Sequence, residues 1–216
     1  MGMMSRKKKI VLTVVAVTLA VGFLICSAVI ILKRIKESGN SNMALLTQRP
    51  SVRGIISIEL MEKIVLSKKK ISGCLDCGKC NETGICAIKD DMLEIHQRVL
   101  EADAIIHSVP VYFWAMTSQM KAYLDRWCVF FDAEWQWQKA YRPKMKGKRI
   151  GLITLCGDSN VSTADPIVHS FKSTCQFSGL NLIGVVQASA STKGEIAKNE
   201  GIKKQAYDLG RKSVTG

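Results

Sequence analysis

Blocks of apolar and polar residues alternate along this chain in two patterns. Short apolar runs bounded by Gly, Pro or Asp are typical of buried strands, and apolar residues three or four positions apart indicate amphipathic helices. Strands are predicted near residues 63–66 and at 104–109, 149–155 and 181–188. Helices are predicted at 43–48, from 92 to about 100, and at 117–131, 165–178 and 200–213.

Strands that alternate with helices along a chain indicate a parallel sheet with helices on both faces. Ligands of such sheets bind beyond the carboxyl ends of the strands. Two predicted loops lie at those ends, residues 110–116 and residues 156–160. These loops therefore form the candidate binding site.

The apolar run of residues 10–32 stands apart from this alternation, because it contains no charged residue. It exceeds the roughly 20 apolar residues that span a bilayer core. Nearly half of the net charge of +13 lies beside it, because residues 1–40 carry seven basic side chains, in residues 6–9 and 33–36, against the single acidic Glu37. Because basic clusters suit lipid headgroups, the run predicts a transmembrane helix. A cleaved signal peptide fits less well, since its apolar region is usually about 7–15 residues. Residues 27–32 would also suit a buried parallel strand.

The basic charge does not favour a nucleic-acid partner. The densest run outside the N-terminal region is Lys68, Lys69 and Lys70, which is more typical of a solvated turn than of a phosphate track. No aromatic residues are interleaved with it to stack on bases. The charge therefore points to a membrane surface rather than to nucleic acid.

Four cysteines follow each other closely in a Gly-containing loop, with the spacing C-x2-C-x2-C-x5-C. The C-x2-C-x2-C start is typical of [4Fe–4S] ligands, which favours an iron–sulfur cluster. Zinc more often takes two C-x2-C pairs with a longer spacer, and free or disulfide-forming thiols are the third interpretation. Cys128, Cys156 and Cys175 lie in or beside apolar segments and are predicted to be core residues, although Cys156 also ends a strand beside Gly157. The candidate metal ligands are Cys74, Cys77, Cys80 and Cys86.

Several motifs together resemble the flavodoxin-like NAD(P)H-dependent FMN reductases, and within them the iron-sulfur flavoproteins most. The stretches are CLDCGKCNETGICAIKDDM at 74–92, ADAIIHSVPVYFWAMTSQMK at 102–121 and YLDRW at 123–127, and the similarity covers roughly residues 38–213. The resemblance implies a doubly wound α/β fold with a five-stranded parallel sheet. We therefore divide the chain into an apolar segment, residues 1–37, and a flavodoxin-like domain, residues 38–216.

The resemblance also implies FMN, bound by three loops. The loop at 110–114 would lie along the isoalloxazine ring, and the loop at 155–158 would lie on its other side. The FMN phosphate would meet the segment after the first strand, where Lys33-Arg34-Ile35-Lys36 replaces the Gly-Ser-Pro-Arg sequence usual in the family. The implied cofactor residues are Ser38, Gly39, Asn40, Ser41, Asn42, Pro110, Val111, Tyr112, Phe113, Trp114, Leu155, Cys156, Gly157 and Asp158.

The function implied is that of an FMN-dependent oxidoreductase that takes electrons from NAD(P)H or an iron–sulfur donor and passes them to a small acceptor. The resemblance further implies a homo-oligomer. No catalytic side chain is predicted: His107 suits a packed core at least as well as a flavin contact, and Asp125 and Arg126 suit structural helix charges. We expect a membrane-anchored protein with its redox domain in the cytoplasm, or otherwise a cytoplasmic one.

Two other functions remain open from the sequence. The altered phosphate segment beside an intact cysteine loop would suit a membrane-anchored iron–sulfur electron-transfer or sensor protein without flavin. The same alteration would suit a non-catalytic remnant, or a chain whose N-terminal sequence was changed by a reading error.

Overall fold

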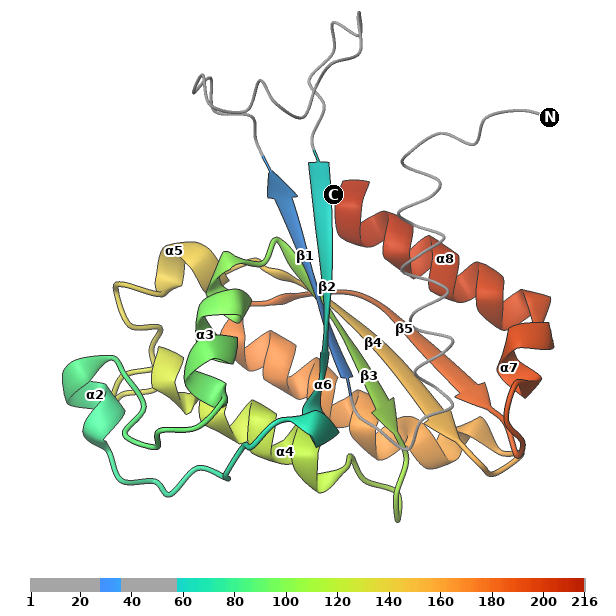
Figure 1. Ribbon diagram of the computed structural model, residues 1–216, viewed down its shortest axis with the longest axis horizontal. Coiled ribbons are helices and arrows are strands. Elements are labelled where there is room, and N and C mark those ends of the chain that lie inside the picture. Colours follow the sequence, from blue (N-terminus) through green and yellow to red (C-terminus); the bar gives the residue numbers. More distant parts are fainter. Residues whose placement is uncertain (1–27, 36–57, 216) are drawn as a thin grey trace, which may run out of the picture.

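A computed structural model of the chain describes residues 28–35 and 58–215, and Figure 1 shows their arrangement. The predicted strands and helices are present in the order expected, and the helix predicted at 43–48 lies outside the described residues. The strands are β1 (Ala28–Ile35), β2 (Ile58–Val65), β3 (Ala104–Pro110), β4 (Arg149–Cys156) and β5 (Asn181–Ser189). The α-helices are α2 (Lys79–Thr83), α3 (Met92–Glu101), α4 (Ser118–Asp125), α5 (Arg142–Met145), α6 (Asp165–Ser178), α7 (Glu195–Lys198) and α8 (Glu200–Thr215), and the 3-10 helices are η2 (Leu66–Lys68), η3 (Arg126–Phe130) and η4 (Val161–Ala164).

Local chemistry sets the ends of these helices. The Thr117 hydroxyl accepts a hydrogen bond from the amide of Met120 at 3.3 Å, which starts α4. The helix predicted at 117–131 then tightens at Arg126 into η3. Pro166 occupies the first turn of α6, and Gly179 ends that helix with a left-handed φ of 62°.

The five strands form one sheet in the order β2-β1-β3-β4-β5. Strands β3, β4 and β5 are parallel, as predicted. Strand β1 is antiparallel to both of its neighbours, with Ala28 opposite Ser108 and Leu32 opposite Ala104. In Figure 1 the arrowhead of β1 accordingly points away from those of β3, β4 and β5. The prediction of a purely parallel sheet is therefore wrong, and the sheet is mixed.

The direction of β1 could not be read from its sequence, because an apolar run that is buried on both faces suits either orientation. Val29 and Ile31 face one core, and Ile30 and Leu32 face the other. Both orientations satisfy the backbone hydrogen bonds of the ladder. The prediction of a buried strand at 27–32 is thus confirmed for Val29–Leu32, but that of a parallel strand is wrong.

Two helical layers cover the sheet (Figure 1). The larger core lies between the sheet and α3, α4 and α6, and the smaller one lies between the sheet and α8. Leu209 of α8 packs so closely on the sheet that a Cβ at Gly184 would lie 2.9 Å from its Cδ1 atom. The flavodoxin-like α/β architecture is therefore present, with the carboxyl ends of β2, β3, β4 and β5 at one edge.

The apolar run at residues 10–32 does not form one continuous helix. Its last five residues belong to β1, and residues 10–27 lie outside the described part of the chain. Within residues 28–35 and 58–215, no helix combines the length and the apolar character that a membrane span requires.

His107 is a packed core residue, which was one of the two interpretations that the sequence allowed. Its ring packs against the rings of Tyr123, Trp127 and Phe171, with centroids 5.7, 6.0 and 5.0 Å away. Burial lowers the pKa of His107 to about 3. Burial also lowers the pKa of His96 to about 4, although its Nε2 atom lies 3.0 Å from the Arg126 carbonyl oxygen. The fold therefore holds both histidines neutral at physiological pH.

These two histidines make the fold acid-sensitive. An unfolded histidine has a pKa near 6.5, so protons favour the unfolded chain once the pH falls below about 6.5, with a slope of up to about 1.4 kcal/mol per pH unit for each histidine. We expect the free energy of unfolding to fall between pH 6.5 and pH 4. Replacing His107→Leu should flatten this slope, and replacing the exposed His169→Gln should not. Denaturant titrations at pH 7, 6 and 5 measure this pH dependence of the free energy of unfolding. Equal slopes in the wild type, His107→Leu and His169→Gln would contradict the lowered pKa of His107.

Candidate functional site

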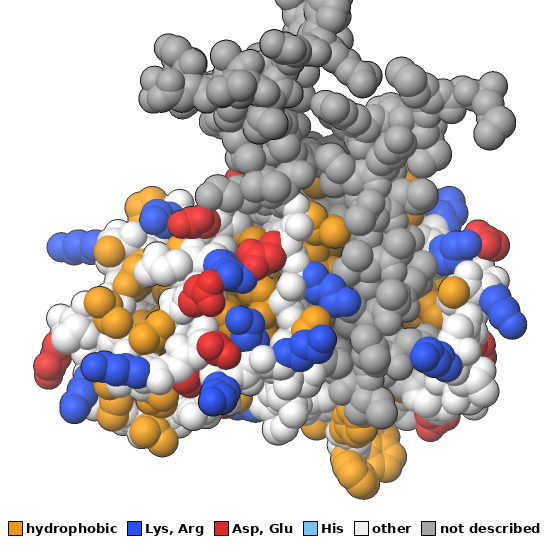
Figure 2. Space-filling view, viewed as in Figure 1, with side chains coloured by type: hydrophobic (Ala, Val, Ile, Leu, Met, Phe, Trp, Pro, Cys, Tyr) orange, Lys and Arg blue, Asp and Glu red, His pale blue; other side chains and the backbone are white. Residues whose placement is uncertain are grey.

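The loop after β3 presents aromatic side chains at the carboxyl edge of the sheet. Tyr112 and Ala115 exchange two backbone hydrogen bonds of 3.0 Å, which closes a tight turn around Phe113 and Trp114. Both turn residues have positive φ, 50° and 60°. Phe113 is 91% exposed and Trp114 62% exposed, so these rings are not core residues. Figure 2 shows hydrophobic side chains that project from this edge of the molecule.

This turn is strained. Positive φ at both central positions defines a type I′ turn, which strongly favours Asn and Gly. A non-glycine residue held there costs on the order of 1–3 kcal/mol. Two large aromatic residues therefore occupy strained positions in which they stay exposed and do not stabilise the fold by burial. Such an arrangement is typical of a binding element.

The second predicted loop meets the first at the same edge. The amide of Val111 donates to the carbonyl of Leu155 at 2.9 Å, and Pro110 lies opposite Leu155 in the β3–β4 ladder. The hydroxyl of Ser189 donates to the carbonyl of Asp158. The structure thus brings together residues 110–114 and 155–158, as the sequence predicted.

Cys156 holds this second loop from the inside. Its side chain is buried, and its thiol donates to the carbonyls of Asp158 at 3.4 Å and Ala188 at 3.6 Å. The side chain of Cys156 therefore faces the inside of the loop that carries Gly157 and Asp158.

The third predicted element cannot be placed at this edge from the described residues. Ser38, Gly39, Asn40, Ser41 and Asn42 lie outside them. Because β1 is antiparallel to β3, its last residue, Ile35, lies at the end of the sheet opposite the loops of residues 110–114 and 155–158. The predicted phosphate segment thus follows a strand that ends away from the candidate site.

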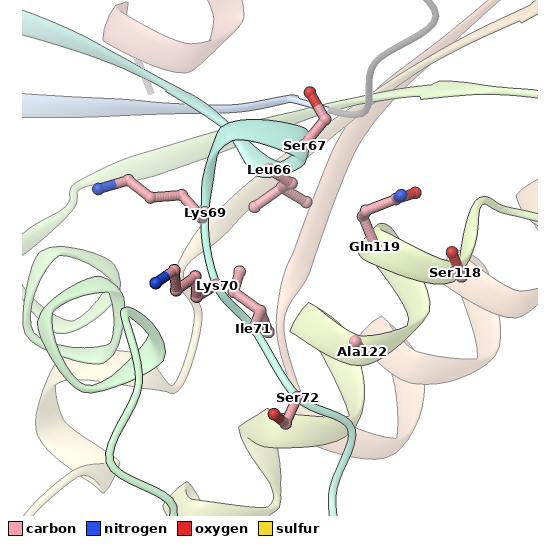
Figure 3. Close-up of a pocket in the computed structure, with 9 residues that line it drawn as sticks. All are labelled: Leu66, Ser67, Lys69, Lys70, Ile71, Ser72, Ser118, Gln119 and Ala122. Carbon is pink, nitrogen blue, oxygen red and sulfur yellow. The ribbon is translucent and has the colours of Figure 1, made fainter.

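A hollow of about 500 Å³ also lies at the carboxyl end of β2. It separates the segment of residues 66–72 from the first turns of α4 (Figure 3). The side chains of Lys69 and Lys70 project away from Ser118 and Gln119, which lie on the opposite side of the hollow. Charged groups do not converge here, so the hollow offers space but no formed anion site.

The cysteine loop forms a separate site beside α2. Five thiols, rather than the four predicted, line one cavity of about 200 Å³ together with Phe131 and Trp135. Cys74 and Cys77 are exposed, and Cys80 and Cys86 are half-buried. The fifth thiol is the half-buried Cys128 of η3. Cys128 was predicted to be a core residue, and it instead lies in the wall of this cavity.

A buried ion pair closes the base of the cysteine loop. The Arg126 guanidinium makes two hydrogen bonds to the Asp90 carboxylate, at 2.7 and 3.1 Å, and others to the carbonyls of Ser72 at 3.0 Å and Ile88 at 3.2 Å. The Asp90 carboxylate also accepts from the amide of Ser72 at 2.9 Å. Both ends of the loop are therefore tied to one guanidinium, and we call this arrangement the Asp90–Arg126 clamp.

The clamp is buried, which decides its energetics. The Arg126 side chain has no exposed area, and that of Asp90 is 9% exposed. Burial opposes ionisation of Asp90, but hydrogen bonds from Arg126, Ser72 and Met92 hold its pKa below the usual range. The same pairing outweighs burial at Arg126 and raises its pKa, and the guanidinium also interacts with the Cys86 thiol.

The far side of the cysteine loop is fixed by the irregular segment of residues 132–148. The Gln138 side-chain amide donates to the carbonyl of Cys80 at 3.1 Å and also to Val129 and Phe131, at 3.0 and 3.1 Å. The Tyr141 hydroxyl donates to the carbonyl of Gly84. The cysteine loop is therefore held at its two ends by the clamp and along α2 (Lys79–Thr83) by Gln138 and Tyr141.

The donor set of this cavity fits an iron–sulfur cluster, because thiolates are its usual ligands. Within the described ranges, however, no three His, Cys, Asp or Glu side chains are arranged to hold a metal ion. Burial raises the pKa of the Cys80 thiol, and that of Cys128 rises to about 11 for the same reason. The loop therefore carries the right ligands in one cavity, and a cluster would have to draw them together.

The fold agrees with the comparison to known families. A model of the flavodoxin-like fold matches residues 44–212. The chain belongs to this family. This flavodoxin-like protein departs from the expected parallel topology at β1, within residues that precede the match.

Three relatives carry names that bear on function. The chain is 32% identical to an iron-sulfur flavoprotein of Archaeoglobus fulgidus, over 70% of this chain and 63% of that protein. It is 43% identical to an iron-sulfur flavoprotein of Methanocaldococcus jannaschii, over 30% of this chain and 34% of that protein. It is 24% identical to a Bacillus subtilis protein named as an NAD(P)H-dependent FMN-containing oxidoreductase, over 64% of this chain and 75% of that protein. This flavodoxin-like chain thus spans less than two thirds of the first two relatives.

The clamp predicts a strong dependence of the fold on Asp90. Replacing Asp90→Asn leaves the Arg126 charge buried without its counter-ion, which typically costs about 3–5 kcal/mol. We expect a loss of that order in the free energy of unfolding, with faster amide exchange across residues 73–87. The control is Asp125→Asn, in the exposed pair with Lys121, where about 0–1 kcal/mol is expected. Equal losses in the two variants would contradict the role of the clamp.

Proposed function

We propose that this chain is an FMN-dependent oxidoreductase of the iron-sulfur flavoprotein type. The observation that carries the proposal is the strained, exposed aromatic turn beside the loop of residues 155–158, at the carboxyl edge of the sheet. The names of the relatives in Archaeoglobus fulgidus and Bacillus subtilis support the same activity.

A flavin suits the chemistry of this edge. The isoalloxazine ring is flat and largely apolar, so it needs aromatic walls along its faces and backbone groups at its polar rim. Tyr112, Phe113 and Trp114 would supply the wall, with Pro110 and Val111 holding the loop to β4. Leu155, Gly157 and Asp158 would border the ring on its other side, positioned by the thiol of Cys156.

When bound, the flavin supplies the redox chemistry, because it can take a hydride and release electrons one at a time. The described side chains therefore bind, orient and shield it. His96 and His107 offer no acid or base for this chemistry, since both are buried and burial lowers both of their pKa values.

We propose that the cysteine loop holds a [4Fe–4S] cluster through Cys74, Cys77, Cys80 and Cys86. The clamp favours this, because a buried guanidinium beside Cys86 would stabilise the negative charge of a thiolate ligand. The Nε atom of Arg126 is buried and has no hydrogen-bond acceptor within the described ranges, so it could donate to that sulfur. When present, a cluster supplies single-electron transfer.

The donor we propose is NAD(P)H and the acceptor a small molecule such as a quinone. We place the redox domain in the cytoplasm, where reduced nicotinamides and the machinery of cluster assembly are found. A homo-oligomer is proposed as well, since exposed aromatic residues such as Trp114, Trp135 and Phe177 suit contact with a second copy.

One observation favours an iron–sulfur protein without flavin as the second candidate. Because β1 is antiparallel to β3, its last residue lies at the end of the sheet opposite the loops of residues 110–114 and 155–158, whereas the family resemblance implies a phosphate segment directly after the first strand. A dianionic phosphate that loses two charge-assisted hydrogen bonds, each worth about 1.5–3 kcal/mol, would bind about a hundredfold more weakly or worse. Iron and sulfide in a protein indifferent to FMN would support this candidate.

The aromatic turn yields a prediction in which stability and binding change in opposite directions. Replacing Phe113→Asn together with Trp114→Gly supplies the residues that a type I′ turn prefers. We expect the free energy of unfolding to rise by about 1–3 kcal/mol as strain is removed. We expect FMN to bind about tenfold more weakly or worse, since one aromatic contact is worth about 0.5–1.5 kcal/mol. Denaturant titration and quenching of FMN fluorescence measure the two effects.

A matched control separates this effect from a general loss of exposed aromatic surface. Phe177 is 63% exposed and lies near Trp135, away from the turn. Replacing Phe177→Ala should leave FMN binding unchanged. If the wild-type chain does not bind FMN at all, the proposed flavin function is wrong; if the turn variant binds it as tightly as the wild type, the assignment of the turn is wrong.

A further inference from the structure

One wall of the cysteine cavity is aromatic. Phe131 and Trp135 line the cavity together with the cysteine loop. The Phe131 ring stacks on that of Trp137, with centroids 4.3 Å apart, and the rings of Trp135 and Phe177 lie 6.2 and 5.8 Å from it. We call these four side chains the aromatic wall. Phe131 is buried, whereas Trp135 and Phe177 are 55% and 63% exposed, so the aromatic wall continues from the cavity onto the surface.

A strained turn holds Trp135 in the aromatic wall. The Asp132 carboxylate accepts hydrogen bonds from the amides of Glu134 at 3.1 Å and Gln136 at 2.9 Å. The Trp135 amide donates to the Asp132 carbonyl at 3.1 Å. Trp135 itself has a φ of 59°, in the left-handed region that a bulky residue rarely adopts. The turn thus fixes an exposed indole beside the cavity, where a ligand can reach it.

The size and charge of the cavity restrict what can bind against the aromatic wall. Its volume of about 200 Å³ lies below the roughly 300–1,000 Å³ of pockets for drug-sized ligands, so it admits one or two fused rings but not a nucleotide. The charged residues that line it, Asp76 and Asp132, are both acidic, so they repel an anion. Aromatic side chains favour stacking with a flat apolar ring. The cavity therefore fits a small, flat and uncharged ring compound.

We propose that the aromatic wall binds a flat, uncharged quinone. The quinone ring lies against Trp135 and Phe177, beside the cysteine loop and away from the aromatic turn of Phe113 and Trp114. In the proposed oxidoreductase this is the place where the small acceptor binds, and that role alone rests on the proposed function. Binding itself forms no bond and transfers no electron. NAD(P)H and FMN carry phosphates and are nucleotides in size, so the same cavity excludes them.

Equilibrium dialysis of duroquinone against the full chain tests the proposal. Duroquinone is uncharged, and its four methyl groups leave no ring carbon free for the addition of a thiol, so the exposed cysteines do not trap it. The bound amount is read from the absorbance of the protein-free chamber, which does not depend on tryptophan fluorescence. We expect saturable binding that is about tenfold weaker in Trp135→Gly and about threefold weaker in Phe177→Ala, because each variant loses a stacking contact. Glycine suits the positive φ of residue 135, so the first variant keeps the turn.

Trp114→Gly is the matched control for Trp135→Gly. Trp114 has a φ of 60° and is 62% exposed, close to the 59° and 55% of Trp135, but it stands on the aromatic turn at the sheet edge. This variant should bind duroquinone as the wild type does, and saturating FMN should not displace the quinone from either protein. Weaker binding in Trp114→Gly than in Trp135→Gly, or displacement by FMN, would place the quinone at the sheet edge and overturn the proposal.

Sedimentation measured in parallel separates a quinone site from a contact between two copies of the chain. If Trp135→Gly dissociates an oligomer and leaves duroquinone binding unchanged, the aromatic wall belongs to a subunit interface and the proposal is wrong. A wild type that binds FMN or iron but no duroquinone would overturn the quinone site alone. A wild type that binds duroquinone through Trp135 but neither FMN nor iron would count against the proposed function and support the quinone site.

Discussion

The buried ion pair between Asp90 and Arg126 is the interaction on which the functional part of this molecule depends. Its four hydrogen bonds to Asp90, Ser72 and Ile88 join the two ends of the cysteine loop to the helical layer over the sheet. An exposed, Gly-rich loop has little apolar surface with which to fix itself. The clamp holds the two ends of the loop in place, and hydrogen bonds from Gln138 and Tyr141 hold the carbonyls of Cys80 and Gly84.

Two kinds of local cost mark the two candidate sites. At the cysteine loop, the charges of Asp90 and Arg126 are buried, and hydrogen bonds offset their loss of hydration. Such an ion pair fixes a specific arrangement but adds little to the free energy of unfolding. At the aromatic turn, Phe113 and Trp114 hold positive φ values and stay exposed. Both features are unfavourable for an isolated domain and become reasonable where a cofactor is held.

The elements that the sequence predicted well are those whose apolar pattern has a single interpretation. The strands at Ala104–Pro110 and Arg149–Cys156, and the loops after them, follow from local runs and their Pro and Gly boundaries. The direction of β1 was missed because burial on both faces carries no directional signal. Arg126 suited a structural helix charge and Cys128 suited a core residue, because the groups that they face, such as Asp90 at 36 positions from Arg126, lie far away along the chain. The role of Asp90 as the counter-ion of Arg126 could be seen only in the tertiary structure.

The central claim is that the clamp holds the cysteine loop ready for a cluster, and iron and sulfide content tests it most directly. The wild type and Asp90→Asn would be reconstituted with iron and sulfide without oxygen, at a temperature where both remain folded, and their bound iron, sulfide and FMN compared. The account predicts a four-iron cluster in the wild type, a marked loss of iron and sulfide in Asp90→Asn, and unchanged FMN at the distant sheet edge. Equal iron and sulfide in the two proteins, or none in the wild type, would contradict it.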